Sequence, residues 1–318
     1  MDTSFSILVP AYKKDFLKEC LNSILSQDYE FFEIIVVNDN SPYDLDSIIQ
    51  EFDSPRLIYK KNIEGFGGKN VVSNWNECLK YANGDFTICM GDDDKLLPSC
   101  LTDYSKLIEK FPEVSVFHTN TQVIDSYSKV IDVQESRPEA ESVYSMLWHR
   151  WFGGRSKQYI GDFAFRTSTL RQKGGFYDLP YGWHSDLLSV CLASQDHGIV
   201  NSSHYGFQYR INTQTISYAT SNYKEKVEST LLANEKFESF LQNSRPVSDS
   251  DRLFLRLIVE KFKEHASESV KMIVKDDLCY NWSIRHFLYW MKHRNRISFS
   301  TKQVLSTALL ALYKKHAL

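Results

Sequence analysis

No Cys-x-x-Cys pair occurs in this sequence, although the chain has six cysteines. Most of them lie within apolar patterns, as Cys20, Cys78 and Cys89 do. Closely spaced cysteine pairs are typical of zinc and redox sites, and disulfide frameworks belong mainly to small secreted domains. The cysteine pattern therefore argues against a zinc site, a redox site and a disulfide framework, and it predicts buried, reduced thiols in a cytoplasmic protein.

Long apolar runs are also missing, because no segment reaches the ~18 apolar residues that a membrane-spanning helix needs. The N-terminus enters a short apolar run at residues 5–9 without the basic region and long hydrophobic stretch of a signal peptide. We therefore expect a cytoplasmic location, with peripheral contact to the inner face of the cell membrane left open.

The chain has little net charge, formally -3 at pH 7, so composition gives no argument for a nucleic-acid partner. Gly-x-Ser-x-Gly, His-Glu-x-x-His and Walker motifs are absent, which weakens hydrolase and ATPase hypotheses. Aromatic residues, at 14%, are plentiful, and such side chains fill cores or line sugar-binding and membrane-facing surfaces.

The first half of the chain alternates strand-like and helix-like segments. Runs that are apolar on both faces, such as residues 32–37, suit buried parallel strands. Further strands are predicted at residues 5–9, 56–60, 86–90 and 114–118, with helices at 16–25, 45–52, 70–81 and 98–111. Repeated units of this kind predict a doubly wound, mostly parallel α/β sheet with right-handed crossovers.

The second half has a different organisation. Residues 121–182 are irregular, and a helix at 186–195 and a strand at 205–210 follow them. Five helices are then predicted, at residues 223–242, 248–265, 267–279, 283–293 and 301–313. We therefore expect an α/β domain over residues 1–221, divided near residue 120, and a helical extension over residues 222–318.

Three consecutive aspartates, Asp92, Asp93 and Asp94, follow the strand predicted at residues 86–90. Adjacent carboxylates repel each other unless a cation or solvent offsets the repulsion, and hard divalent cations prefer such oxygen ligands. Open α/β sheets bind ligands at the carboxyl ends of their strands. The triplet is thus either a metal site for a phosphate-bearing substrate or an acidic turn in which one aspartate caps the next helix.

Asp39 follows another buried strand, within a segment rich in turn-forming residues. If the two strands are neighbours, Asp39 and the triplet converge on one crevice. The alternative for Asp39 is an Asx-turn, which its Asn, Ser and Pro neighbours would suit.

A set of short motifs, in this order, resembles the inverting family 2 glycosyltransferases with the GT-A fold. The motifs are Val9-Pro10-Ala11-Tyr12, Val37-Asn38-Asp39-Asn40-Ser41, Asn83-Gly84-Asp85, Gly91-Asp92-Asp93-Asp94, Gly174-Gly175-Phe176 and His184-Ser185-Asp186. The resemblance covers roughly residues 4–212 and leaves out the helical tail. It implies a Rossmann-like nucleotide-sugar half over residues 1–120 and an acceptor half over residues 121–221.

On the donor side, the resemblance implies that Asp39 accepts hydrogen bonds from a uracil imide and a ribose hydroxyl. Pro10, Ala11 and Tyr12 would form a wall against the base, since a tyrosine face packs well on a flat heterocycle. Asp92 would lie near the ribose or the donor sugar.

Lys69 follows a glycine-rich turn at the start of a helix, where the family often has arginine. It would add positive charge near the donor phosphates. A solvated lysine on a flexible loop is the alternative.

The resemblance also implies that Asp93 is the main ligand of Mn²⁺ or Mg²⁺, acting as a Lewis acid on the diphosphate leaving group. Asp94 would cap the next turn or hold metal-bound water. Gly91 departs from the family by occupying its first acidic position. Asn212 stands where the family often has histidine, and asparagine lacks a titrating imidazole. His204 is a candidate to replace that histidine as a ligand, or else a structural residue.

Asp186 matches the family's general base. It would take the proton from an acceptor hydroxyl as that oxygen attacks the anomeric carbon, so that one displacement inverts the centre. The alternative is an aspartate favoured by the dipole at a helix N-terminus.

The predicted function is metal-dependent, inverting transfer of a sugar from a nucleotide-sugar, UDP-linked by analogy, to a glycan or lipid-linked acceptor. Assembly of a bacterial surface polysaccharide rests on family analogy. Two alternatives are a nucleotidyltransferase, which would use the same metal–nucleotide crevice, and a non-catalytic glycan-binding protein.

The final stretch, residues 281–318, contains no Asp or Glu but seven Lys and Arg residues, interspersed with aromatic and aliphatic side chains. Basic amphipathic helices can lie on anionic membrane surfaces. The alternative is a helical cap that buries its aromatics against the catalytic domain or against a second subunit, as in a homodimer.

Overall fold

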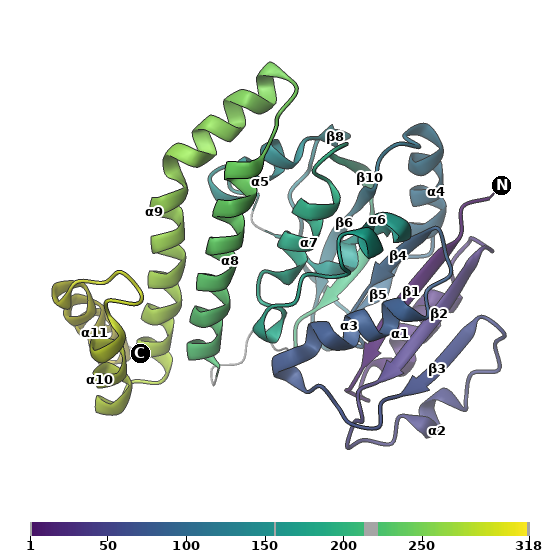
Figure 1. Ribbon diagram of the computed structural model, residues 1–318. Coiled ribbons are helices and arrows are strands. Elements are labelled where there is room, and N and C mark those ends of the chain that lie inside the picture. The colour runs from purple at the N-terminus through teal and green to yellow at the C-terminus, as the bar shows by residue number, and fades with distance from the viewer. Residues whose placement is uncertain (1, 156, 213–221, 317–318) are drawn as a thin grey trace. The chain divides into compact units, whose positions relative to one another are not determined.

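The computed structural model describes residues 2–155, 157–212 and 222–316, which fold into two compact units (Figure 1). The first is the α/β part of the chain and ends at the gap before residue 222. The second contains Leu179–His184 and the helices that follow the gap. The segment just before Asp186 thus belongs with the helical unit, whereas the sequence-based division assigned it to the α/β domain.

The first unit is built on one mixed sheet, whose main path runs β3-β2-β1-β4-β9-β6-β10-β5. The strands are β1 (Phe5–Ala11), β2 (Phe32–Asn38), β3 (Leu57–Lys61), β4 (Phe86–Cys89), β5 (Lys95–Leu96), β6 (Val116–Ile124), β7 (Val130–Val133), β8 (Ala140–Glu141), β9 (Phe163–Arg166) and β10 (Ile199–Arg210). β7 pairs with β6, and β8 with β10. The predicted α/β class is confirmed, and the second half of the sheet is mixed because β9 runs antiparallel to both β4 and β6.

The first half of the sheet places the carboxyl ends of its strands together. β1 pairs in parallel with β2 on one side and with β4 on the other. The apolar runs of all three strands are almost wholly buried, as expected for parallel strands covered on both faces. β2 and β4 are therefore not neighbours: their polar ends lie on either side of the end of β1.

Helices connect these strands. They are α1 (Leu17–Leu25), α2 (Asp46–Ile49), α3 (Val71–Lys80), α4 (Cys100–Lys110), α5 (Val143–Trp151), α6 (Thr167–Gln172) and α7 (Ser185–Ala193), with short 3-10 turns η1 (Gly68–Asn70) and η2 (Ile160–Asp162). The predictions missed α5, although its cap has a recognisable signal. The Ser142 hydroxyl accepts a hydrogen bond from the Ser145 amide, as serine N-caps commonly do.

The second unit consists of η3 (Pro180–Gly182), α8 (Tyr223–Asn243), α9 (Asp249–Tyr280), α10 (Ile284–His293) and α11 (Thr301–His316). Its core includes Val274, Leu278, Trp290 and Val304. Two helices were predicted where the structure has the single helix α9, because Ala266, at the predicted break, favours helix continuation. Among the described residues, no helix combines the length and apolarity needed to cross a membrane.

Candidate active site

Asp92 joins the acidic turn to the end of β1. Its Oδ2 accepts hydrogen bonds from the Tyr12 amide at 2.7 Å and from the Lys13 amide at 2.6 Å. Burial raises the pKa of the Asp92 carboxyl, and the Lys13 ammonium and the two amides oppose that rise. The carboxylate therefore holds the backbone turn that follows β1.

Asp93 receives its hydrogen bonds from side chains. The Lys13 ammonium contacts Asp93 Oδ2 and lies 3.6 Å from Asp92 Oδ1. The Asn212 amide donates to the same Asp93 oxygen at 2.8 Å. Burial by itself would lower the pKa of Lys13, but Asp92 and Asp93 outweigh it, so the net shift is upward. Sequence reasoning missed Lys13, whose only signal was a basic residue directly after the first strand.

Asp94 closes the acidic turn and ties it to β10. Its Oδ1 accepts from the Arg210 amide at 2.9 Å, and its Oδ2 accepts from the Gly91 amide at 3.2 Å. Burial, followed by the neighbouring Asp93, raises the pKa of the Asp94 carboxyl well above its usual range. The buried Arg210 guanidinium donates to the Asp93 carbonyl at 2.7 Å and to Glu19 at 2.8 Å.

Gly91, in the family's first acidic position, lies close to the carboxylates of the turn. A Cβ on Gly91 would lie 2.8 Å from Asp94 Oδ2 and 2.9 Å from Asp93 Oδ1. Real Cβ atoms do not approach carboxylate oxygens so closely, so a larger residue at position 91 would require these two carboxylates to move.

The donor set of the turn fits a hard divalent ion at one carboxylate. Backbone amides hold Asp92 and Asp94, whereas the partners of the Asp93 carboxylate within the described part of the chain are the side chains of Lys13 and Asn212, which can rotate away. Carboxylate oxygens suit Mn²⁺ and Mg²⁺. Among the described residues, no three metal-ligating side chains converge. An ion here would therefore take Asp93 as its protein ligand and complete its shell from substrate or water.

Asp39 organises the loop that follows β3. Its Oδ1 accepts from the Phe66 amide at 2.8 Å and from Asn62 Nδ2 at 3.1 Å, and its Oδ2 accepts from the Gly67 amide at 2.9 Å. A Cβ on Gly65 would lie only 2.4 Å from the Asp39 carbonyl oxygen, so this approach requires glycine. The loop is thus wrapped around the carboxylate.

The Ser41 amide, which an Asx-turn at Asp39 would use, has a different acceptor. It donates to Asn38 Oδ1, three residues before it, at 2.8 Å. The Asp39 carboxylate is bound instead by the loop after β3.

The predicted wall residues lie between the two acidic regions. The Ala11 carbonyl accepts from the Asp39 amide at 2.9 Å, and the Tyr12 side chain is 45% exposed next to it. Pro10 pairs with Val37 in the register of β1 and β2. Lys69 is exposed in η1, two residues after Gly67, whose amide bonds Asp39.

Asp186 lies in the first turn of α7. Burial raises the pKa of its carboxyl to about 6, against the opposing effects of the Leu187 amide and the Arg150 guanidinium. Burial also lowers the pKa of the Arg150 guanidinium, and the negative charge of Asp186 partly offsets that decrease. Arg150 comes from α5 and was not predicted, because its electrostatic effect on a residue far along the chain leaves no mark in the sequence.

Two stacked tyrosines lie next to the acidic turn. The Tyr159 and Tyr209 rings lie 4.1 Å apart at an interplanar angle of 21°. Tyr209 directly precedes Arg210, whose guanidinium donates to the Asp93 carbonyl.

His204 does not join this group. Its Nδ1 lies 3.2 Å from Asp103 Oδ2, and the side chain is 68% exposed. Six residues of strand separate it from Arg210, which corresponds to roughly 20 Å of extended chain. The structure thus pairs His204 with Asp103, and Asn212 is the residue whose side-chain amide reaches Asp93.

Comparison with solved structures identifies the class of fold. S. aureus TarS 1–349 in complex with UDP-GlcNAc matches 99% of this chain and 92% of that chain, with a TM-score of 0.65 and 15% identity. A mannosyltransferase from Pyrobaculum calidifontis, in complex with GDP-Man and Mn²⁺, matches with a TM-score of 0.56 and 12% identity, covering 99% of this chain and 88% of that one. The fold is of the GT-A type.

Residues 6–170 match the family described as glycosyl transferase family 2. The chain belongs to this family. The Campylobacter jejuni GalNAc(5)-diNAcBac-PP-undecaprenol beta-1,3-glucosyltransferase is 37% identical over 111 residues, which are 34% of each chain. The putative glycosyltransferase EpsE of Bacillus subtilis is 29% identical over 111 residues, 35% of this chain and 40% of the relative. The chain thus matches only about a third of the length of these relatives.

Proposed function

We propose that this protein transfers a sugar from a nucleotide donor to a hydroxyl group of a glycan or lipid-linked acceptor, with inversion at the anomeric carbon. The observation that carries the proposal is the grouping of Asp39, Tyr12 and Asp92 around the end of β1. This edge of an α/β sheet is where nucleotides bind. The half-exposed Tyr12 ring provides a face for the base, with a carboxylate on either side.

Asp39 serves two purposes in this proposal. Its oxygens hold the loop around Phe66 and Gly67, and carboxylate oxygens have further lone pairs for a uracil imide or a ribose hydroxyl. Asp92 is fixed by backbone amides in the place proposed for the ribose or donor sugar. Lys69, exposed beyond the same loop, adds a cation on the donor side.

Asp93 is the proposed ligand for Mn²⁺ or Mg²⁺, and Asp94 supports it by fixing the turn. A divalent ion bound there would neutralise charge that develops on the diphosphate leaving group. The Lys13 ammonium, which contacts Asp93 Oδ2, would move from that oxygen to a phosphate oxygen when donor and ion bind. Asn212 remains available as an amide donor to the carboxylate.

Asp186 is the proposed general base. A carboxyl with a pKa of about 6 is largely ionised at neutral pH and more basic than an ordinary aspartate, which suits removal of a proton from an acceptor hydroxyl. Arg150 keeps part of the carboxyl population ionised despite burial. The oxygen of the acceptor hydroxyl, as it loses its proton to Asp186, attacks the anomeric carbon in line with the departing diphosphate and inverts that centre in one step.

The named relatives support the choice of donor and acceptor. The Campylobacter jejuni relative is named for a lipid-linked acceptor, and TarS is described in complex with UDP-GlcNAc. A UDP-linked donor and a lipid-linked or polymeric acceptor, in the assembly of a bacterial surface polysaccharide, are therefore our proposal for this chain. Such an acceptor would bring the enzyme to the cytoplasmic face of a membrane.

The two alternatives receive less support from the geometry. A nucleotidyltransferase would use amides after the first strand to hold phosphates, but here the Tyr12 and Lys13 amides are both bound to Asp92. A glycan-binding protein would have no use for a half-buried carboxyl with a raised pKa such as that of Asp186.

Titration calorimetry with UDP and GDP, each in Mn²⁺ and in EDTA, tests the proposal. We expect UDP to bind at least tenfold more tightly in Mn²⁺ than in EDTA, and more tightly than GDP. A panel of UDP-sugars, followed by release of UDP, then identifies the donor. Absence of binding by every nucleotide tested would overturn the proposed function.

A further inference from the structure

The outward face of α10 carries exposed aliphatic side chains. Ile284 is 72% exposed and Leu288 is 58% exposed. They lie four residues apart and therefore next to each other on one side of the helix. Arg285 and Lys292 are exposed on the same side, since they lie three positions before and four positions after Leu288.

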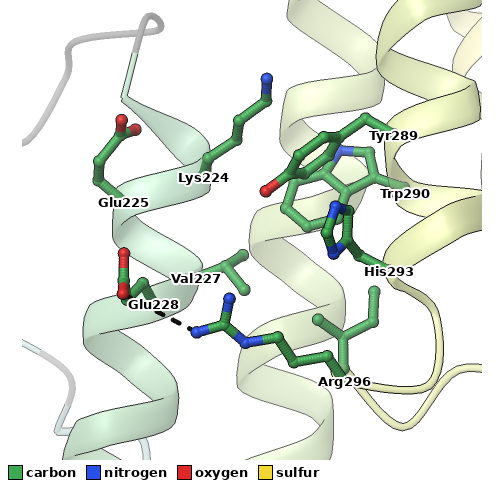
Figure 2. Close-up of a pocket in the computed structure, with 9 residues that line it drawn as sticks. Lys224, Glu225, Val227, Glu228, Tyr289, Trp290, His293 and Arg296 are labelled. Atoms are coloured by element: carbon green, nitrogen blue, oxygen red, sulfur yellow. Dashed lines mark ion pairs between the residues drawn. The ribbon is translucent and has the colours of Figure 1, made fainter.

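The opposite face of α10 packs inside the helical unit. Figure 2 shows Tyr289 and Trp290 on the side that faces Lys224 and Val227 of α8, around a cavity of about 200 Å³. Trp290 is buried, and its indole donates to Asp277 at 2.7 Å. The inner face of α10 thus packs into the core of the unit, whereas the aliphatic side chains of its outer face are not part of that core.

The outward face of α11 repeats the arrangement. Leu305, Leu309 and Tyr313 follow one another at four-residue spacing and are 45%, 67% and 76% exposed. Val304 and Ala308 on the other side are buried in the core. α10 and α11 pack against each other, so that the two outer faces belong to neighbouring helices.

Charge distinguishes this region from the other exposed apolar side chains of the helical unit. No acidic residue occurs in residues 281–318. On α9, by contrast, the exposed Val259 is followed directly by Glu260. Aliphatic side chains interspersed with Lys and Arg, and with no Asp or Glu, are the composition of helices that lie at anionic lipid surfaces.

We propose that the outer faces of α10 and α11 form a docking surface for an anionic lipid bilayer. The aliphatic side chains would enter the headgroup boundary, while Arg285, Lys292 and Lys302 would contact lipid phosphates. A second copy of the chain fits less well, because a symmetric dimer brings the same patch against itself and would oppose two basic surfaces. The inference goes beyond the proposed transfer reaction and does not depend on it.

Flotation of the full-length protein with vesicles tests this surface. One set of vesicles is phosphatidylcholine alone, and the other contains phosphatidylglycerol as well. We expect at least tenfold stronger binding to the anionic vesicles, reduced by high salt. The double variant Leu288→Glu/Leu309→Glu should lose at least tenfold in binding, since it places acids in the centre of both faces.

A matched control is the double variant Leu253→Glu/Val259→Glu, which changes two exposed aliphatic residues of α9. It should float as the unchanged protein does. Binding of UDP and the far-ultraviolet circular dichroism spectrum show that each variant is folded. Unchanged UDP binding with lost flotation would separate this surface from the donor site.

Failure to float with anionic vesicles would overturn the proposal, as would equal losses in the two double variants. Analytical sedimentation tests the alternative that a second copy of the chain binds to these helices. The proposal would likewise be overturned if the protein does not bind vesicles but self-associates, and if Leu288→Glu/Leu309→Glu abolishes that self-association. This result would show that a second copy covers these helices.

Discussion

The acidic turn after β4 and the N-terminus of α7 both contain carboxyls whose pKa is raised by burial, but their partners differ. Asp92 and Asp94 are held by backbone amides of distant segments. Asp186 has an arginine, Arg150, as its main charged neighbour and a pKa of about 6. Carboxylates fixed by amides shape the site, whereas a carboxyl poised near neutral pH is suited to proton transfer.

The comparison predicts the largest effect at Asp186. Asp186→Asn keeps the size of the side chain but removes the basic oxygen, so transfer should fall by about 10²- to 10⁴-fold. UDP affinity should stay unchanged, as measured by calorimetry alongside initial rates of transfer. Asp196→Asn, at an exposed aspartate just beyond α7, is the matched control. Near-normal turnover in Asp186→Asn would refute the assignment of the base.

At Asp92 we expect the main loss to be in stability. Asp92→Ala leaves the partly buried Tyr12 and Lys13 amides without their charged acceptor, which should lower the free energy of unfolding by about 1–3 kcal/mol. Urea unfolding measures this difference. Asp93→Ala, which among the described residues removes the acceptor of side-chain donors rather than of backbone amides, should lose less. If the two variants are equally destabilised, the proposed division between shaping and binding residues does not hold.

Asp93→Ala should instead weaken nucleotide binding that depends on the metal. The expected loss is roughly tenfold or more in UDP affinity in Mn²⁺, about 1.4 kcal/mol, with little change in EDTA. Calorimetry of the variant in both conditions provides the measurement. Equal affinities of variant and unchanged protein in Mn²⁺ would remove Asp93 as the ligand.

The smallest predicted effect is on the pH dependence of transfer. Asp186 must be ionised to act as a base, so the rate should rise with pH, reach half its plateau near pH 6 and be about tenfold lower at pH 5. Arg150 lowers the pKa of Asp186, so Arg150→Met should move the midpoint to higher pH. A rate profile that is flat between pH 5 and 7 would contradict the assignment.

Much of the fold could be predicted from local patterns. Apolar runs such as residues 32–37 specify buried strands because both faces must be covered by helices. The irregular region at residues 121–182 could not be assigned, because β7, β8 and β9 are short strands, of which β8 and β9 pair with distant strands and β7 with the end of β6. By contrast, the single helix α9 could have been predicted, because Ala266, at the predicted break, favours helix continuation.

The predicted acidic residues of the candidate site could be found in the sequence because each follows a buried strand or begins a helix. Their partners could not. Lys13 meets Asp93 across 80 residues of chain, and Arg210 meets Asp93 across 117. Such contacts arise only when β1, β4 and β10 come together in one sheet.

The sequence by itself thus determined the strands, the carboxylates at their ends and the acid-free tail, because these depend on residue type and local spacing. Tertiary structure alone decided which carboxylate is held by amides, which one faces Lys13 and which has its pKa raised to about 6. It also decided which faces of α10 and α11 remain exposed. Burial and long-range partners control these properties, and neither is a property of a short segment.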